Sequence, residues 1–139
     1  MPTLPSSILI TVVIILLILF IGLIFWTQNK RSRISPQELK KFQNHWQGIL
    51  KEIKSSPKNA VLEADKLLDQ ALKLKNYTGS LGEKMKKAGP LFSDRNGVWG
   101  AHKLRNRIAH ELNIKVSDFE AKKALGQFKT ALRDLGIKL

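Results

Sequence analysis

The longest apolar segment of the chain lies at its N-terminal end. No charged side chain occurs between Pro2 and Asn29, and residues 8–26 consist almost entirely of Ile, Leu, Val and Phe. A helix of about twenty residues is roughly 30 Å long, close to the thickness of the hydrocarbon core of a bilayer. The pattern therefore predicts a single transmembrane helix over residues 8–29, preceded by a short tail of residues 1–7.

A cleaved secretory signal is the competing interpretation of this segment. A signal peptide has a basic first region, an apolar stretch of about 7–15 residues and small residues at its cleavage site. Here residues 1–7 carry no basic side chain, the apolar stretch is longer, and Phe25 and Trp26 stand near its end. A buried core helix is disfavoured as well, because a helix that is apolar on all sides needs a large protein around it. We therefore expect a retained membrane anchor.

The cationic residues next to this anchor all follow it, in a short basic linker over residues 30–35, whereas residues 1–7 contain none. By the positive-inside tendency, this asymmetry places residues 30–139, including the bundle over residues 36–139, in the cytoplasm and the N-terminal tail outside. Aromatic rings and cationic groups favour the boundary between the bilayer and water. The predicted membrane-interface residues are Phe25, Trp26, Lys30, Arg31 and Arg33.

The rest of the chain, residues 36–139, has a helical pattern throughout. Each apolar stripe with helical spacing is preceded by a Ser or Asp that can act as an N-cap, several times with Pro directly after it or Glu three positions on. No stretch alternates for long enough to predict a strand. The expected N-caps are Ser35, Ser56, Ser80, Ser93 or Asp94, and Ser117, and the expected ends lie near Ser55, Asn76, Gly89, Leu112 and Gly136.

These segments predict an all-α fold, with the anchor followed by an antiparallel bundle of four to five helices. Trp46 is expected in the core of the bundle. Leu112, at the end of one apolar stripe, and Phe119, at the start of another, are expected to be buried as well. The basic cluster over residues 84–87 is interpreted as a solvated face.

All charges of the chain follow the anchor. The 24 Lys and Arg exceed the 11 Asp and Glu, which gives a formal net charge of +13. Such an excess predicts an anionic partner, either nucleic acid or the anionic headgroups of the bilayer, although simple solubility of a small basic protein is an alternative. Because the chain has no cysteine, disulfides and thiolate metal sites are excluded.

One segment carries groups that can act on a phosphodiester. Arg105, Asn106 and His110 lie on one predicted helix, where their side chains can converge on one patch. In RNA cleavage without a metal, His110 would move a proton to or from the 2′-hydroxyl or the leaving oxygen, and Arg105 would neutralise the charge that builds on the phosphate. Asn106 would orient either group. Further nucleic-acid contacts are expected from His102, Lys103 and Arg107.

The run from Arg105 to His110 resembles the motif of the HEPN superfamily, whose members are small helical bundles marked by Arg, four to six residues, then His, often with Asn after the Arg. The order of the helices over residues 36–136 is also similar. This resemblance implies an RNA-binding module or ribonuclease that uses no metal and no other cofactor. It also implies a homodimer in which two motif helices face each other across a cleft. Leu112 stands where some toxin members carry a regulatory Tyr.

Two functions from different classes remain open. The first is a membrane-anchored, HEPN-like domain that binds RNA, with metal-independent endonucleolytic cleavage as its enzymatic form. The second is a non-catalytic, membrane-tethered interaction module that docks to anionic lipid or to an acidic partner. In the second case Arg105, Asn106 and His110 would stabilise the dimer or the fold instead of acting on RNA.

Overall fold

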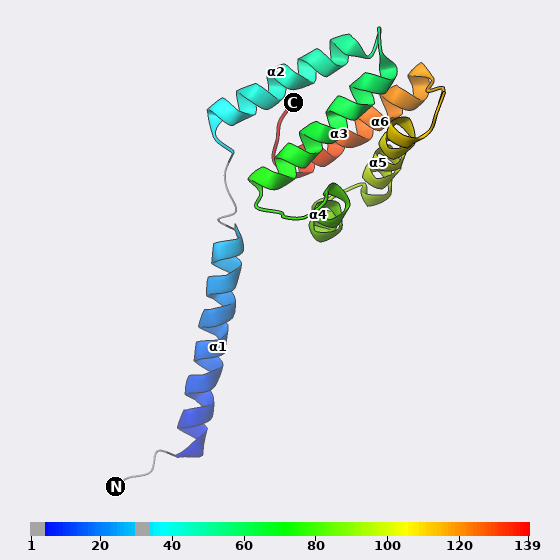
Figure 1. Cartoon of the computed structure of the whole chain (residues 1–139). Helices are drawn as coiled ribbons and strands as arrows, with labels where there is room; N and C mark the ends of the chain where they lie inside the picture. Colours follow the sequence, from blue (N-terminus) through cyan, green and yellow to red (C-terminus); the bar gives the residue numbers. More distant parts are fainter. Residues whose placement is uncertain (1–4, 30–33) are drawn as a thin grey trace. The chain divides into compact units, whose positions relative to one another are not determined.

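The computed structural model of the chain describes residues 5–29 and 34–139, without the side chains of Ser6 and residues 24–29 (Figure 1). All regular structure in these residues is helical, which confirms the predicted all-α class. The chain divides into two compact units, Met1–Arg33 and Ile34–Leu139. The helices are α1 (Ser6–Asn29), α2 (Pro36–Glu52), α3 (Pro57–Leu74), α4 (Leu81–Ala88), α5 (Arg95–His110) and α6 (Asp118–Asp134), with the short 3₁₀ helix η1 (Gly89–Leu91) after α4.

Helix α1 forms the first unit. It begins slightly before the predicted segment and includes 24 residues. Its large apolar side chains from Ile8 to Leu23 are between 47% and 63% exposed. Over the residues that the structure describes, no helix combines the length and the hydropathy that crossing a membrane requires. The interface predictions lie outside the described residues: the side chains of Phe25 and Trp26, and the linker residues Lys30, Arg31 and Arg33.

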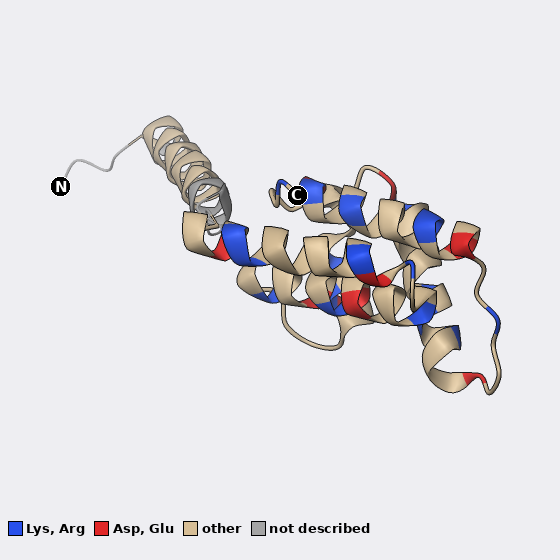
Figure 2. Ribbon diagram, turned by 90° about the horizontal axis from the view of Figure 1, so that it is seen from above, with Lys and Arg blue, Asp and Glu red and all other residues tan. Residues whose placement is uncertain are grey.

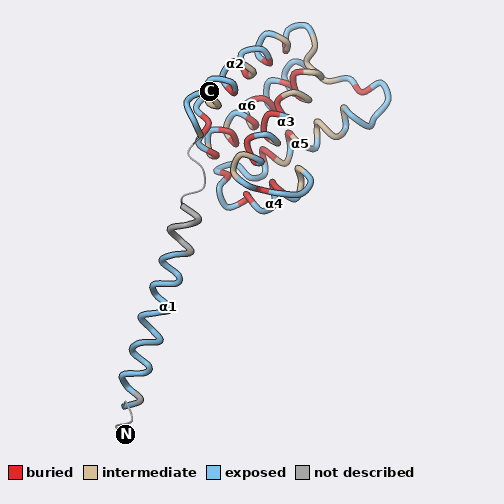
Figure 3. The backbone as a smooth tube through the Cα atoms, turned by 60° about the vertical axis from the view of Figure 1, so that its left-hand side comes forward, coloured by how far each residue is buried: buried red, intermediate tan, exposed pale blue. Residues whose placement is uncertain are grey.

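Helix α3 is the centre of the second unit, because it packs against α2, α4, α5 and α6. Helices α2 and α5 run in the opposite direction to α3, and α6 runs in the same direction (Figure 1). The buried positions lie along the inner faces of these helices (Figure 3). Trp46 on α2 is 2% exposed, as predicted, and Leu68 on α3 and Phe128 on α6 are fully buried. The bundle therefore has one hydrophobic core.

Helix starts follow the predicted capping chemistry with one exception. Ser35, Ser80 and Ser117 each form a capping box with the Glu three residues on. Asp94 caps α5, since its carboxylate accepts a hydrogen bond from the backbone N–H of Gly97 at 2.8 Å. Ser56 is the N-cap of α3 but makes no capping bond with its side chain. There Pro57 supplies the start instead, because its fixed φ suits the first helical position.

Two predictions of burial are wrong. Leu112 is 95% exposed and Phe119 is 74% exposed. Helix α5 ends at His110, before the predicted end, so Leu112 falls in a connection that turns through Asn113 with a φ of 58°. Phe119 lies in the first turn of α6, where no described helix covers it. Ile114, at 9% exposure, is the connection residue that reaches the core instead.

The interpretation of residues 84–87 as a solvated face is wrong for one of its lysines. Lys84 is 2% exposed, and its Nζ lies 2.5 Å from Asp69 Oδ1. The reason is that α4 is short and presents this position to α3, where the charged group finds a carboxylate instead of water. Lys87 Nζ donates to the carbonyl oxygen of Thr78 at 3.0 Å, while Lys86 is exposed.

Candidate functional site

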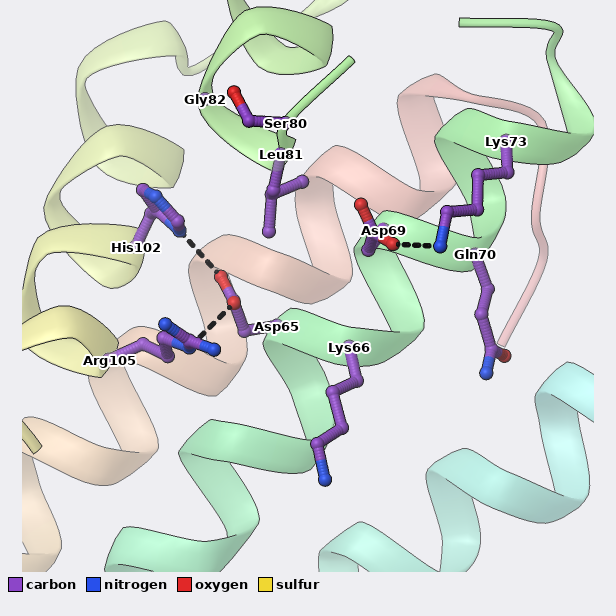
Figure 4. A pocket seen from close by; sticks show the side chains of 10 residues that line it. All are labelled: Asp65, Lys66, Asp69, Gln70, Lys73, Ser80, Leu81, Gly82, His102 and Arg105. Carbon is purple, nitrogen blue, oxygen red and sulfur yellow. Dashed lines mark hydrogen bonds and ion pairs between the residues drawn. The ribbon is translucent and has the colours of Figure 1, made fainter. Parts of the chain in front are cut away.

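A buried carboxylate on α3 connects this helix to α5. Asp65 is 2% exposed and faces two side chains of α5. Its Oδ1 lies 2.8 Å from His102 Nδ1, and its Oδ2 lies 3.0 Å from Arg105 Nε (Figure 4). A buried carboxylate is stable only when it is paired and hydrogen-bonded. Asp65 therefore fixes the position of two of the functional groups that the sequence singled out.

Asn106 closes this arrangement into a ring of four side chains. Its Nδ2 lies 3.2 Å from His102 Nε2, and its Oδ1 accepts a hydrogen bond from Arg105 Nη1 at 3.0 Å. An amide nitrogen can only donate, so His102 Nε2 must be the acceptor and Nδ1 must carry the proton that goes to Asp65. The ring therefore specifies the neutral imidazole with hydrogen on Nδ1. We call Asp65, His102, Arg105 and Asn106 the α3–α5 network.

The guanidinium of Arg105 is only partly satisfied within this network. Its Nε is within ion-pair distance of Asp65, but the N–H is not aligned with an acceptor. Among the described side chains, Arg105 Nε is a buried polar atom that forms no hydrogen bond. The side chain as a whole is 31% exposed. The Nε atom of Arg105 is thus held next to Asp65, while part of the guanidinium group reaches solvent.

A pocket of roughly 690 Å³ opens beside the network, between α3, the start of α4 and α5 (Figure 4). Its volume is within the range of small-molecule sites in proteins. Acidic and basic groups line it together with the apolar side chain of Leu81 and the backbone of Gly82. The full lining is Asp65, Lys66, Asp69, Gln70, Lys73, Ser80, Leu81, Gly82, His102 and Arg105.

Asp69, one helical turn after Asp65, is paired on two sides. Lys84 Nζ lies 2.5 Å from its Oδ1 and Lys73 Nζ lies 2.7 Å from its Oδ2. Burial raises the pKa of Asp69, but the hydrogen bonds from Lys73 and Lys84 outweigh it and leave the pKa below its ordinary value. The carboxylate is therefore neutralised both from the inside of the protein and from the pocket rim.

A third carboxylate of α3, Glu63, lies on the side that faces α2. It accepts a hydrogen bond from Lys66 Nζ at 2.7 Å and lies 3.3 Å from His45 Nε2. The bond from Lys66, opposed by burial, keeps the pKa of Glu63 below its ordinary value. His45 therefore contacts a side chain of the neighbouring helix.

The predicted site residues divide into two groups in the structure. Arg105 and Asn106 lie in the α3–α5 network together with His102, which was expected to contact nucleic acid. His110 is exposed in the last turn of α5, does not line the pocket, and takes part in no hydrogen bond or ion pair of the described residues. Lys103 and Arg107 are exposed on α5, and Arg107 Nε lies 3.2 Å from Glu111 Oε1.

Sequence reasoning missed Asp65. A signal was present, because Asp65 follows Val61 by four residues and precedes Leu68 by three, so it occupies a core position of the apolar stripe of α3. A charged residue in such a position needs a partner on the neighbouring helix. The basic residues on α5, among them His102 and Arg105, could therefore have been considered as partners of Asp65.

The described part of the chain contains no group of three or more His, Asp or Glu side chains that could hold a metal ion. The chain matches no protein-family model, no curated protein and no solved structure.

Proposed function

We propose that the bundle binds single-stranded RNA along the exposed face of α5. The observation that carries this proposal is the placement of Lys103, Asn106, Arg107 and His110. Asn106 and Arg107 each lie three or four residues from both Lys103 and His110, so all four share one side of the helix. Lys103, Arg107 and His110 are exposed. Such a face offers cations to phosphates and polar groups to bases and riboses.

The charge distribution of the bundle supports an anionic partner. Almost every acidic side chain already has a structural task, in a helix cap, in an ion pair or as a hydrogen-bond acceptor, and many Lys and Arg side chains face solvent without such a partner in the described residues. Figure 2 shows the basic residues spread over several helices. The acidic residues with such tasks are Glu38, Glu52, Glu63, Asp65, Asp69, Glu83, Asp94, Glu111, Glu120 and Asp134.

The enzymatic form of this proposal is a HEPN-like ribonuclease that needs no metal. In it, His110 is the general acid or base, Arg105 stabilises the charge on the phosphate, and Asn106 holds Arg105 in place. The support is the run from Arg105 to His110 and the bond between Arg105 and Asn106. Arg105 is directed toward Asp65 on α3, whereas His110 is exposed at the end of α5, so one protomer does not bring the two groups together. The α5 helix of a second protomer would complete the site.

We also propose that residues 8–29 anchor the protein in a bilayer with the bundle on the cytoplasmic side. This proposal rests on the sequence of the whole uncharged segment, of which the structure describes the side chains of Ser7–Leu23. It is supported by the exposure of its large apolar side chains and by the cations that follow it.

The chain is free of cysteine, so single-cysteine variants test the anchor directly. In sealed vesicles of inverted orientation, a membrane-impermeant maleimide should label Asn44→Cys on α2 and should label Thr3→Cys only after detergent is added. Labelling of both positions before detergent would contradict a membrane crossing between them.

The RNA-binding proposal is tested by fluorescence anisotropy with a labelled single-stranded RNA and the full-length protein in a non-ionic detergent. The double variant Lys103→Ala/Arg107→Ala should weaken binding and reduce the slope of log affinity against log salt by about 0.7 for each phosphate that the variant no longer neutralises. The matched control is Lys122→Ala/Lys123→Ala, which removes two exposed cations from α6. Equal losses of affinity in both variants would contradict a specific face on α5.

Cleavage is tested on the same protein with an RNA pool in the presence of EDTA. Wild type should cut the pool, and His110→Ala should bind RNA but not cut it, because His110 is exposed and its removal leaves the network intact. RNA that is bound but stays uncut by wild type would favour a non-catalytic binding module.

The second candidate function, docking to anionic lipid, is favoured by one observation. Leu112 and Phe119 are exposed, and Lys115, Lys122 and Lys123 are exposed near them in sequence. Apolar side chains beside cations are typical of peripheral contact with an anionic bilayer. Binding to phosphatidylserine vesicles that drops in Leu112→Ser/Phe119→Ser, with RNA binding unchanged, would support it; vesicle binding equal to wild type would contradict it.

A further inference from the structure

The pocket between α3, α4 and α5 combines cationic side chains with an apolar wall. Figure 4 shows Arg105 and Lys73 on different sides of the pocket and Leu81 between them. Leu81 is a half-buried apolar side chain, and Gly82 next to it leaves the wall without a side chain. A ligand that fits has a flat apolar part with an anionic group on each side.

The two carboxylates in the pocket do not repel such a ligand, because each is neutralised from another direction. Lys84 is buried, does not line the pocket and holds Asp69 Oδ1 at 2.5 Å. Lys73, whose side chain is 63% exposed, can therefore turn from Asp69 to a phosphate without leaving that carboxylate unpaired. A ligand thus competes only with the exposed ion pair between Lys73 and Asp69 and leaves the pair between Lys84 and Asp69 in place.

Asp65 is compensated in a similar way. His102 donates to its Oδ1 at 2.8 Å from within the network, so the carboxylate keeps a hydrogen bond when the outer part of Arg105 engages a ligand. The bond between Arg105 Nη1 and Asn106 Oδ1 also keeps the guanidinium at the pocket wall. Guanidinium groups bind phosphate with two parallel hydrogen bonds, and Arg105 is partly exposed for this purpose.

The pocket adjoins the proposed RNA-binding face where Arg105 Nη1 donates a hydrogen bond to Asn106 Oδ1 at 3.0 Å. Arg105 lines the pocket, and Asn106 belongs to the face with Lys103, Arg107 and His110. A strand that lies on α5 can therefore turn one of its bases into the pocket.

We propose that this pocket receives one unpaired nucleotide of the RNA that binds α5. The base lies against Leu81, above Gly82, and the two phosphates that flank the nucleotide face Arg105 and Lys73. This inference rests on the proposed function and names the substrate class more closely: single-stranded RNA, read one nucleotide at a time at this position. Paired bases are excluded, because a base in a duplex cannot enter a pocket of this kind without leaving its stack.

The probe is a nucleoside 3′,5′-bisphosphate, which carries one base and both flanking phosphates. Its affinity for the full-length protein in a non-ionic detergent is measured by titration calorimetry, for uridine and adenosine forms. Pyrophosphate, which has charge but no base, is the control ligand. Wild type should bind at least one bisphosphate about tenfold more tightly than pyrophosphate, because the apolar wall adds to the charge contacts.

Two pairs of variants locate the site. Gly82→Leu places an apolar side chain at the pocket wall, and its Cβ meets only Trp99 Cη2 at 3.8 Å, an ordinary contact; circular dichroism checks that the variant is folded. The matched control is Gly126→Leu on α6, where nothing lies within 4 Å of the new Cβ. Lys73→Met removes the rim cation, and Lys129→Met removes an exposed lysine of α6. Gly82→Leu and Lys73→Met should each weaken bisphosphate binding by about tenfold, and the two controls should not change it.

Failure of this inference is distinguishable from failure of the proposed function. If wild type binds RNA but folded Gly82→Leu binds the bisphosphate and RNA as well as wild type, the pocket proposal is overturned and the α5 face stands. Pyrophosphate that binds as tightly as the bisphosphate also overturns it, in favour of a simple anion site. If the bisphosphate binds in the pocket but RNA binding does not depend on Lys103 and Arg107, the pocket stands and the RNA face fails. If folded wild type binds neither probe, both are wrong.

Discussion

The carboxylate of Asp65 on α3 holds the imidazole of His102 on α5, with 2.8 Å between Oδ1 and Nδ1. Asn106 Nδ2 lies on the other side of the imidazole, 3.2 Å from Nε2 of His102. The two contacts select one tautomer of His102 and, through Asn106, the orientation of Arg105. A group that sequence reasoning had left aside, Asp65, is thus the centre of the site.

Removal of Asp65 should destabilise the bundle. In Asp65→Ala, His102 loses its hydrogen-bond acceptor and the buried Nε of Arg105 loses its ion-pair partner. We expect the free energy of unfolding to fall by about 3 kcal/mol, the lower end for a broken buried pair because Arg105 is partly exposed. Urea denaturation followed by circular dichroism measures this. Asp118→Ala, which removes an exposed carboxylate on α6, should stay within about 0.5 kcal/mol of wild type. Equal effects in the two variants would refute the role of Asp65.

The ion pair between the buried Lys84 and the partly exposed Asp69 predicts a non-additive mutant pair. Lys84→Met keeps the apolar stem but leaves Asp69 with Lys73 alone, and should lower the free energy of unfolding by about 2 kcal/mol. The double variant Lys84→Met/Asp69→Leu removes both charges and should regain most of this loss, since well-packed apolar residues often replace such a pair without cost. A double variant that loses the sum of both single effects would show that the pair has no coupling.

The capping boxes predict a loss of stability in acid. The pKa of Glu83 is lowered mainly by the hydrogen bond from the backbone N–H of Ser80 and, to a smaller extent, by the bond from the Ser80 hydroxyl. The same two groups of Ser117 lower the pKa of Glu120. Between the lowered folded pKa and the unfolded value of about 4.3, the unfolded chain binds more protons. The stabilisation is therefore complete above about pH 4.3 and is lost as the pH falls through the folded pKa.

The measurement is the urea midpoint from about pH 6 down to about pH 3, below the ordinary pKa of Glu. Wild type should lose stability in this range, and Glu83→Gln/Glu120→Gln should depend less steeply on pH, because the glutamine side chain can still accept the capping bonds but does not titrate. Asp118→Asn serves as the comparison variant on α6. A double variant with the same slope as wild type would exclude these two boxes as the source of the acid sensitivity.

The exposure of Leu112 and Phe119 predicts that both can be replaced by polar residues at little cost. Leu112→Ser/Phe119→Ser should leave the free energy of unfolding within about 0.5 kcal/mol of wild type. Leu125→Ala, at a position that is 3% exposed, should cost about 2–5 kcal/mol. Thermal or urea unfolding compares them. A large loss of stability in the serine variant would mean that these side chains are covered in the folded protein, for example by a second copy of the chain.

The starts of the helices could be predicted from the sequence because capping is local. Ser35, Ser80 and Ser117 bond to groups within three residues, so the signal and the structure lie in the same short segment. The helix ends were less accurate. Helix α2 stops at Glu52, before the predicted Ser55, since Pro57 disfavours helical backbone in the residue before it and Ser55 and Ser56 form a turn on Glu52.

The partners of charged residues could not be predicted, because they depend on which helices pack together. Lys84 in a basic cluster looks solvated until α4 is placed against α3. His102 was expected only as a further nucleic-acid contact, and its bond to Asp65, which is 37 residues away in the chain, could not be read from α5 alone. Helical spacing predicts which residues share a face, but it does not say which neighbouring helix that face meets.

Photochemical cross-linking locates the RNA on the protein and so shows whether it binds along α5 beside the pocket. A single-stranded RNA with a photoreactive uridine analogue is irradiated with the full-length protein in detergent, and the linked peptides are identified by mass spectrometry. RNA bound along α5 should give cross-links concentrated in peptides from α5 and the start of α4, and these should be lost in Lys103→Ala/Arg107→Ala but not in Lys122→Ala/Lys123→Ala. Cross-links spread evenly over the basic surfaces of α2 and α6, or absent from α5, would contradict it.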